Sequence, residues 1–213
     1  MLKIPNTPTS LVIAGAWNPD ILTPKWVAKE VLGLQLGQNF PVNVQVPIGN
    51  PTHRPTYEFE NIKYVSSRTS LSFFIDQDDS EQIRKSVSTV KKILELLVHT
   101  PITGFGFNLF FEIENPTTAL LDTFSSGSLL INLIEGNDMQ TVGENWKSII
   151  KADDYLLSLD ALLEGGKVLL SFNVHFEVLN AAEAAEQLQD ENLFGNIKSL
   201  VQKIANSLDV LGE

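Results

Sequence analysis

The segment that most constrains the fold is residues 104–116, which read GFGFNLFFEIENP. Apolar side chains recur there at every second position, namely at Phe105, Phe107, Leu109, Phe111 and Ile113. Alternate residues of an extended chain point to opposite faces, so this spacing predicts a β-strand with one apolar face. Phe110 is the exception to the alternation. Such a strand belongs in a sheet whose apolar face is covered by helices.

The opening Gly-x-Gly of this segment also occurs in phosphate-binding loops. Such a loop needs its glycines after a strand and before a helix, with a third glycine at a set distance. Here the glycines precede the strand, and position 109 is leucine. We therefore interpret Gly104 and Gly106 as marking a β-bulge, or a place where another backbone or a bulky ring lies close.

A similar segment follows 65 positions later. Residues 107–115 read FNLFFEIEN and residues 172–180 read FNVHFEVLN, while residues 42–50, VNVQVPIGN, share the asparagines and the apolar alternation. Two interpretations remain open. Either a strand-and-cap unit was duplicated, giving halves at about 38–100 and 103–213, or alternation and the preference of asparagine for turns produce the likeness. In both, the segments are equivalent strands of one antiparallel or mixed sheet.

Other strands are predicted from apolar alternation and flanking turn residues. They lie at residues 10–16, 41–48, 57–59, 62–65, 70–75, 146–150, 155–163 and 168–178. The last two flank Gly165 and Gly166, which indicates a hairpin. Residues 41–48 have the pattern of a half-buried strand, and Pro47 places it at an edge or an end. Residues 129–134 form a buried strand or helix that periodicity does not distinguish.

Helices are predicted where the apolar period changes and capping residues appear. Thr23 and Pro24 begin a short helix over residues 25–34. Asp78, with Glu81, caps an amphipathic helix that ends near His99. Asn115, followed by Pro116, is expected to cap a short helix that ends near residue 124. Asn180 is expected to cap a further helix, with an interruption near 189–192 and a second amphipathic helix over 193–208.

Composition supports one folded domain. Of 213 residues, 43% are hydrophobic and 19% charged, which is typical of globular proteins and predicts a single α+β domain over residues 1–213. The chain has no cysteine, which excludes disulfides, thiolate nucleophiles and cysteine-bound metals. No stretch approaches the ~18 apolar residues of a membrane span, and the N-terminus lacks a signal-peptide core. We therefore expect no membrane association and a cytoplasmic location.

The net charge limits the partners. Asp and Glu number 26 against 15 Lys and Arg, a net charge of -11. Such a field repels phosphate backbones, so nucleic-acid binding is not expected. The three arginines, Arg54, Arg68 and Arg84, fall within residues 54–84, and that clustering is the only feature that favours nucleic acid.

The histidines supply the candidates for chemistry. His175 lies between Asn173 and Glu177 at alternate positions, so the three side chains share one strand face and are candidate catalytic residues. The same pattern is typical of the solvated face of a sheet. His53 and Arg54 lie between prolines in a loop that presents them as candidate ligands for an anion, or as an ordinary exposed loop. His99, at a helix end, has a structural interpretation.

The remaining charged groups fit structural roles. Asp153 and Asp154 are expected in a turn, although paired carboxylates also bind metals. Arg84, Lys85, Lys91 and Lys92 form a basic stripe on one helix, which is either its solvated face or a docking stripe for an acidic partner. No motif of a hydrolase, metalloprotease, phosphate loop or calcium loop occurs, so no metal site and no cofactor are predicted.

These observations favour a non-enzymatic binding protein that acts through protein-protein contact. It would be an accessory or inhibitory subunit, or a homodimer. The alternative is a small-ligand-binding protein or an enzyme whose pocket lies over the strand face of His175, with His53 or Arg54 contributing.

Overall fold

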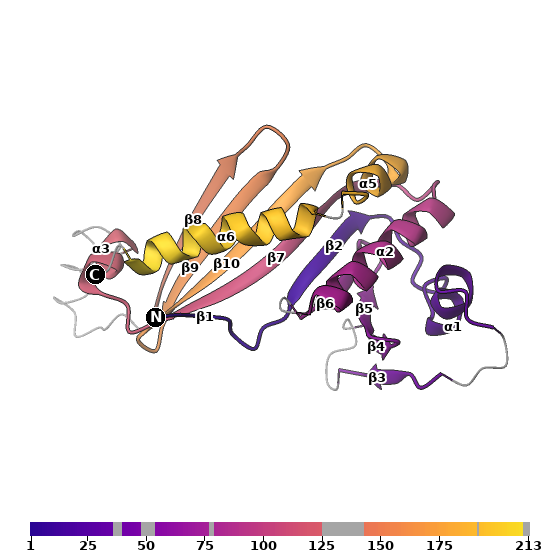
Figure 1. The fold of residues 1–213 in the computed structure, drawn as a ribbon, viewed down its shortest axis with the longest axis horizontal. Coiled ribbons are helices and arrows are strands. Elements are labelled where there is room, and N and C mark those ends of the chain that lie inside the picture. The colour runs from indigo at the N-terminus through magenta and orange to yellow at the C-terminus, as the bar shows by residue number, and fades with distance from the viewer. Residues whose placement is uncertain (36–39, 48–53, 77–78, 125–142, 191, 211–213) are drawn as a thin grey trace. The chain divides into compact units, whose positions relative to one another are not determined.

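The computed structural model describes residues 1–35, 40–47, 54–76, 79–124, 143–190 and 192–210 (Figure 1). Over these residues the chain is an α+β protein with a ten-stranded, open and mostly antiparallel sheet. Asp78, His53 and the element predicted at residues 129–134 lie outside the described residues.

The chain forms two compact units that interleave along the sequence. The α2 unit comprises residues 8–108 and 175–195, and the α6 unit comprises residues 1–7, 109–174 and 196–213. Strands β7 (Ile102–Glu114) and β10 (Lys167–Glu177) contribute residues to both units. The predicted single domain and internal duplication are not tested by this division and stay predictions.

The strands of the α2 unit follow one another in the order β3-β4-β5-β6-β2-β7-β10. Their bounds are β2 (Thr9–Gly15), β3 (Asn43–Gln45), β4 (Thr56–Phe59), β5 (Ile62–Ser66) and β6 (Ser70–Ile75). Leu11 of β2 pairs with Phe73 of β6 on one side and Phe107 of β7 on the other, and all three side chains are buried. The predicted strands at 10–16, 57–59, 62–65 and 70–75 are thus confirmed.

The helices of the α2 unit begin at side-chain caps. Thr23 accepts a hydrogen bond from the Trp26 amide at 3.3 Å and starts α1 (Pro24–Trp26), which continues as the π-helix η1 (Val27–Val31). Helix α2 (Ser80–Leu96) is capped by Asp79, whose carboxylate accepts from the Gln82 amide at 2.9 Å. The cap predicted at Asp78 was therefore wrong by one residue. Helix α5 (Ala181–Gln187) contacts α2, which in turn contacts β5 and β6.

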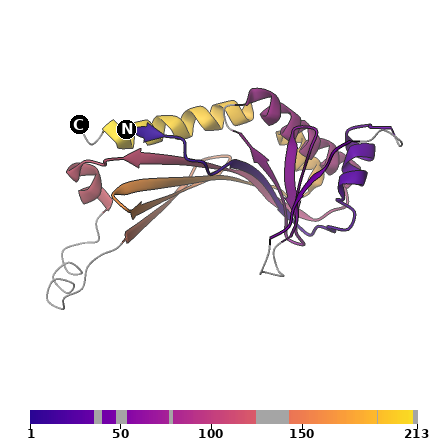
Figure 2. The same cartoon turned by 90° about the horizontal axis from the view of Figure 1, so that it is seen from below.

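The α6 unit contains a second group of strands. Strands β8 (Gly143–Lys151) and β9 (Leu156–Glu164) follow β7 and β10 in the order β7-β10-β9-β8, and β1 (Leu2–Lys3) pairs with β7. Gly165 and Gly166 have φ values of 59° and 77°, which confirms the predicted hairpin turn, because such turns need positive φ at both positions. Helices α3 (Thr118–Phe124) and α6 (Leu193–Val210) complete the unit, and α6 runs alongside its strands (Figure 2).

The two similar segments are neighbouring strands of the sheet. Strand β7 buries the side chains of Phe105, Phe107 and Phe111, and β10 buries those of Phe172 and Phe176. Within the α2 unit Phe105 stacks on Phe176 at 4.8 Å between ring centroids, and within the α6 unit Phe111 meets Phe172 at 5.9 Å. The prediction of extended segments with buried aromatic faces is confirmed.

Two further local predictions were wrong. The segment at residues 41–48 yields only the three-residue β3, and all three residues are exposed, with Val44 at 47% exposed. It is the terminal strand, as predicted, but a terminal strand has one neighbour, so its apolar residues are not enclosed. Helix α3 is capped by Thr117, whose hydroxyl accepts from the Leu120 amide at 3.4 Å, and not by Asn115, which has φ 52°.

Candidate functional site

The α2 unit contains a surface groove of about 440 Å³ between α2 and the connection from α5 to α6. We call it the α2 groove. Its lining comes from α2, from β7 and from residues 188–195: Ser80, Ile83, Arg84, Val87, Ser88, Lys91, Phe107, Leu188, Gln189, Asp190, Asn192, Leu193, Phe194 and Gly195. All of these residues lie within the one unit.

The lower part of the α2 groove is apolar. Phe107 and Phe194 meet edge to face with their ring centroids 5.3 Å apart, and both are almost completely buried. Leu188 is buried beside them, while Ile83 and Val87 of α2 are half-buried. The groove therefore exposes part of an aliphatic helix face, Ile83 and Val87, next to an aromatic pair that is itself almost completely enclosed, and this aliphatic face is the part that an apolar side chain can contact.

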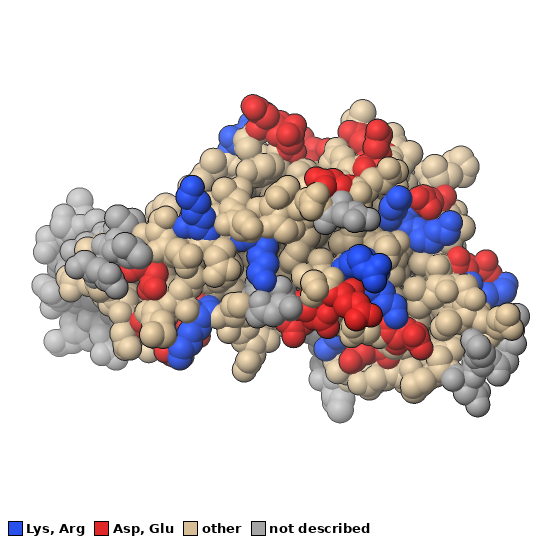
Figure 3. All heavy atoms as spheres, in the orientation of Figure 1, with Lys and Arg blue, Asp and Glu red and all other residues tan. Residues whose placement is uncertain are grey.

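The rim of the α2 groove is polar and partly basic. Arg84 is exposed and Lys91 half-buried, and both line the groove. Lys91 lies 3.9 Å from Glu95, a weak ion pair, whereas Lys85 pairs with Glu60 and Lys92 with Glu95. Two of the four residues of the predicted basic stripe line the groove. These are Arg84 and Lys91, whereas Lys85 and Lys92 do not line it. Basic and acidic side chains lie close together over α2 in Figure 3.

Among the described lining residues one side chain is acidic, that of Asp190, and it is engaged within the chain. Asp190 accepts a hydrogen bond from the Asn192 amide at 2.9 Å through its carboxylate, and its carbonyl accepts from the Leu193 amide at 3.0 Å. These bonds shape the turn that leads into α6. Asp190 therefore has a structural role, and the described residues of the rim include two cations, Arg84 and Lys91.

Local capping positions the connection that closes the groove. Asn180 accepts from the Glu183 amide at 3.0 Å, and the Glu183 carboxylate accepts from the Leu179 amide at 2.8 Å. This arrangement fixes the start of α5, and the cap at Asn180 is the one that the sequence predicts. Helix α5 contacts α2, so its end delivers Leu188 and Gln189 to the groove.

The predicted row on β10 is present as a strand face. Asn173 and His175 are half-buried and Glu177 is exposed, alternating with the buried Val174 and Phe176. The His175 ring lies against Gly104, which confirms that a bulky ring lies close to one of the two glycines. None of the three lines the α2 groove. A catalytic role for them, and a ligand pocket over His175, stay predictions.

The other predicted candidates are dispersed. Arg54 is exposed at the end of a described segment, and the structure does not describe its neighbour His53. His99 follows α2 and is exposed, and Asp153 and Asp154 occupy an exposed bend between β8 and β9, as expected of a turn. Across the described residues, no three His, Asp or Glu side chains are grouped in a way that would hold a metal ion.

A second groove, of about 390 Å³, lies in the α6 unit beside β1 and is lined by Leu2, Lys3, Ile4, Phe111 and Gln202. Ion pairs surround this strand: Lys3 lies 2.5 Å from Glu114, and Lys167 lies 2.7 Å from Glu112. The hydrogen bond from Lys3 lowers the pKa of Glu114, and the hydrogen bond to Glu112 raises the pKa of Lys167. The pair of Lys3 with Glu114 joins β1 to β7, and the pair of Lys167 with Glu112 joins β10 to β7.

Comparison with known proteins gives no indication of function. The chain matches no protein-family model, and no curated protein is significantly similar to it in sequence. No helix in the described part of the chain is both long and apolar enough to cross a bilayer.

The residues of the α2 groove that sequence reasoning missed are those after α5. Leu188, Asn192 and Phe194 stand about 100 positions from α2 in the sequence. Helical periodicity identified Phe194 as apolar but gave no sign that it meets Phe107. The interrupted helix near residues 189–192 was the one available signal, because a break between two helices exposes side chains that a continuous helix would enclose.

Proposed function

We propose that this protein is a non-enzymatic binding protein that holds an acidic segment of a partner protein in the α2 groove. One observation carries the proposal: two cations, Arg84 and Lys91, stand at the rim of a groove whose base is the aromatic pair Phe107 and Phe194. The chain as a whole is strongly acidic, with a net charge of -11, which makes a basic rim a local exception.

The groove favours a peptide segment over a nucleic acid or a bare anion. Its apolar base rewards burial of a side chain such as Leu or Phe, which contributes about 1.5 to 3 kcal/mol when fully enclosed. Arg84 and Lys91 then select carboxylates beside that anchor, because complementary charge at a rim adds specificity and association rate. A helical segment with apolar anchors and acidic flanks matches this arrangement.

The same proposal includes the finer architecture. Helices α2, α5 and α6 would cover one face of the sheet, and the buried apolar faces of β7 and β10 support this. The protein would act as an accessory or inhibitory subunit in the cytoplasm.

The experiment is a selection of displayed 12-residue peptides on the immobilised protein, followed by titration of the enriched peptide by fluorescence anisotropy. We expect enrichment of Asp, Glu and one or two large apolar residues. Arg84→Glu should weaken the selected peptide at least tenfold. Lys92→Glu is the matched control, since Lys92 is exposed on the same helix but does not line the α2 groove.

Two results would contradict the proposal. Selection of basic or uncharged peptides would show that Arg84 and Lys91 do not select the ligand. If Arg84→Glu and Lys92→Glu weakened binding equally, the net charge of the protein, and not a contact in the α2 groove, would explain the loss of affinity. The salt dependence of the affinity separates a groove contact from a general charge effect. At 0.5 M salt the apolar contribution of a groove contact remains, whereas long-range electrostatic attraction is screened.

A further inference from the structure

Strand β8 occupies the end of the strand order in the α6 unit. All nine of its residues pair with β9, from Gly143 opposite Glu164 to Lys151 opposite Leu156. Among the described residues no strand pairs with its other edge, although α3 contacts it. In an antiparallel pair, every second residue of such a strand directs its N–H and C=O away from its neighbour. The outer edge of β8 therefore offers backbone groups for a further strand.

The side chains of β8 are unusually apolar for an edge. Ile149 is 64% exposed, Ile150 is 51% exposed and Trp146 is 36% exposed. The strand contains no proline, and its register with β9 is continuous, so it has no bulge. Strand β3 at the other end of the order is only three residues long and is soon followed by Pro47. Short length and proline protect an edge from pairing, and β8 has neither.

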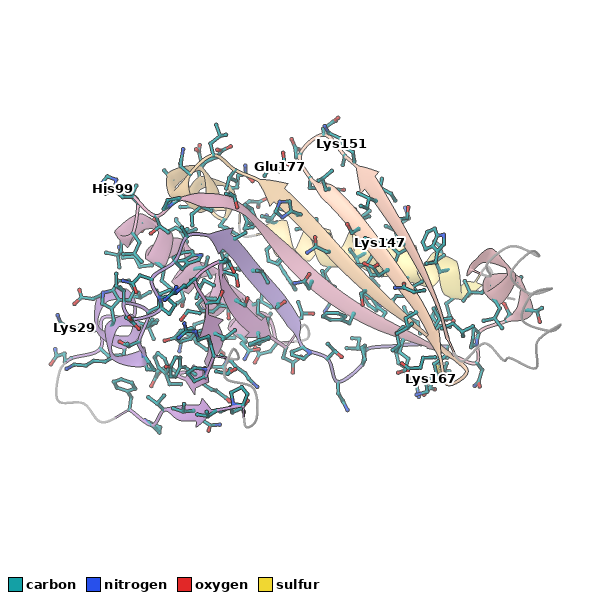
Figure 4. All side chains as sticks on the ribbon, turned by 180° about the vertical axis from the view of Figure 1, so that it is seen from behind. Lys29, His99, Lys147, Lys151, Lys167 and Glu177 are labelled. Carbon is teal, nitrogen blue, oxygen red and sulfur yellow. The ribbon has the colours of Figure 1, made fainter. Side chains whose placement is uncertain are left out.

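The apolar residues of β8 continue a buried surface. Trp146, Ser148 and Ile150 lie opposite Ala161, Leu159 and Leu157 of β9, and those three partners are at most 5% exposed. Directly opposed residues share a sheet face, so Trp146 and Ile150 extend the buried face outward to the edge. Lys147 and Ile149 alternate with these residues and point to the other face. There Lys147, labelled in Figure 4, pairs with Asp160 at 3.4 Å.

We propose that β8 pairs in antiparallel fashion with β8 of a second copy of this chain, about a two-fold axis through Ser148. This pairing uses no residue of the α2 groove and does not depend on the proposed function. It places Trp146 of each copy opposite Ile150 of the other, and Lys147 opposite Ile149. A two-fold axis perpendicular to the sheet makes the interface self-complementary, as in most homodimers.

Charge selects this register over its neighbours. A two-fold axis perpendicular to the sheet requires opposed residues to share a face, so the axis moves in whole residue positions along β8. An axis at Lys147 puts the two copies of that lysine opposite each other, and an axis at Ile149 puts Lys147 opposite Lys151. Like charges in direct opposition destabilise a pair of strands. The Ser148 register has no such pair.

The expected dimer is weak and strengthened by salt. A nine-residue edge buries less than the roughly 1,200 Å² of a stable interface, which predicts micromolar dissociation. Each copy carries a net charge of -11, so the copies repel one another at long range. Raising the salt concentration screens that repulsion and should increase the dimer fraction.

Sedimentation equilibrium of the full chain between 1 and 200 µM, at 50 mM and 500 mM salt, tests the association. We expect a monomer-dimer equilibrium, at least tenfold weaker in Ile150→Lys. The matched control is Val44→Lys, which changes a residue of similar exposure (47%) on the opposite terminal strand β3 and should leave the equilibrium unchanged. A monomer at every concentration overturns the proposal, and so does an equal loss in both variants.

Cysteine cross-linking tests the register directly, because the chain has no cysteine of its own. In Ser148→Cys the two Cα atoms across the axis should lie about 4.5 to 5.5 Å apart, within disulfide range. In Ile150→Cys they should lie about 14 Å apart, because each copy is displaced two residues from the axis. We expect a covalent dimer under mild oxidation from Ser148→Cys alone. Equal cross-linking of both variants, or of neither, overturns the register.

Discussion

The imidazole ring of His175 lies against the backbone of Gly104, in the space that a side chain on Gly104 would need. A Cβ built on Gly104 would stand 2.8 Å from His175 Nε2 and 2.8 Å from the Phe176 carbonyl oxygen. Real Cβ contacts do not occur at such distances. Gly104 therefore serves to bring β7 and β10 together where His175 crosses it, which is a packing role and not a phosphate-binding one.

Replacing Gly104 by alanine should destabilise the protein by about 1 to 3 kcal/mol, the usual cost of overpacking. The His175 ring can turn away, but the Phe176 carbonyl belongs to the backbone of β10 and cannot. Urea unfolding measures the loss. The double variant Gly104→Ala with His175→Ala should recover only part of it, because the clash with the carbonyl persists.

Gly195→Ala is the matched control for that measurement. Gly195 lies in α6, and a Cβ there meets nothing within 4 Å. Alanine at such a position reduces the entropy of the unfolded chain and should stabilise by about 0.4 to 1 kcal/mol. Destabilisation of similar size at both glycines would contradict the argument from His175 and Phe176.

Tyr64 should make the stability depend on alkaline pH. Its hydroxyl donates to the Leu22 carbonyl at 3.0 Å, its ring stacks on Phe73, and its side chain is fully buried. Burial raises the pKa of this phenol well above its ordinary value. The neutral form is favoured in the fold, so its contribution is fully present below the unfolded pKa of about 10 and is lost as pH rises beyond it.

Tyr64→Phe tests this assignment in two ways. At pH 7 it should cost about 1 to 2 kcal/mol, because the Leu22 carbonyl loses its donor within the core. Between pH 9 and 11 the variant should lose less stability than the wild type, which urea unfolding at each pH would measure. An unchanged difference between the two proteins across this range would show that Tyr64 does not control the alkaline limit.

Glu114 should contribute at neutral pH and lose its contribution in acid. The hydrogen bond from Lys3 lowers the pKa of this carboxylate, and the charge of Lys167, 3.8 Å away, acts in the same direction. A depressed folded pKa means that the stabilisation is present above the unfolded pKa and disappears as pH falls through the folded pKa. NMR titration of the Glu114 carboxyl carbon measures that pKa directly.

Lys3→Gln provides the control for the ion pair. It should move the Glu114 pKa back toward its ordinary value, and Glu114→Gln should flatten the acid limb of the stability curve. Both effects should shrink at high salt, since Lys3 and Glu114 are partly exposed. A Glu114 pKa that does not respond to Lys3→Gln would contradict the proposed cause.

The parts of this fold that could be predicted from the sequence are those that local chemistry determines. The alternation around Phe107 and Phe172 is set by the strand period alone, so it predicted β7, β10 and their buried faces correctly. The paired glycines at 165 and 166 determine a turn by their own φ values. Such features depend on neighbours in sequence, and sequence reveals them.

Features that depend on distant contacts were not readable. Val44 has the alternation of a half-buried residue, but it lies on a terminal strand and is exposed. From the sequence, Arg84 and Lys91 are interpreted as part of a solvated stripe. The structure shows that Phe194, far along the chain, lines the same groove. The candidate site is made by that long-range contact, so only its basic half could be predicted.

Asn180 should stabilise both α5 and the wall of the α2 groove. Its side chain accepts from the Glu183 amide at 3.0 Å, so Asn180→Ala should cost about 1 kcal/mol, whereas Asn180→Asp keeps the acceptor and should cost little. Hydrogen exchange at the amides of Glu183 and Ala184 should accelerate in the alanine variant alone. Because α5 positions Leu188 and Gln189, that variant should also weaken peptides bound in the groove, although Asn180 does not line it. If the alanine and aspartate variants show the same amide exchange rates and the same peptide affinity, the cap at Asn180 does not control the groove. The connection from α5 to α6 would then be held by its contacts with α2 alone.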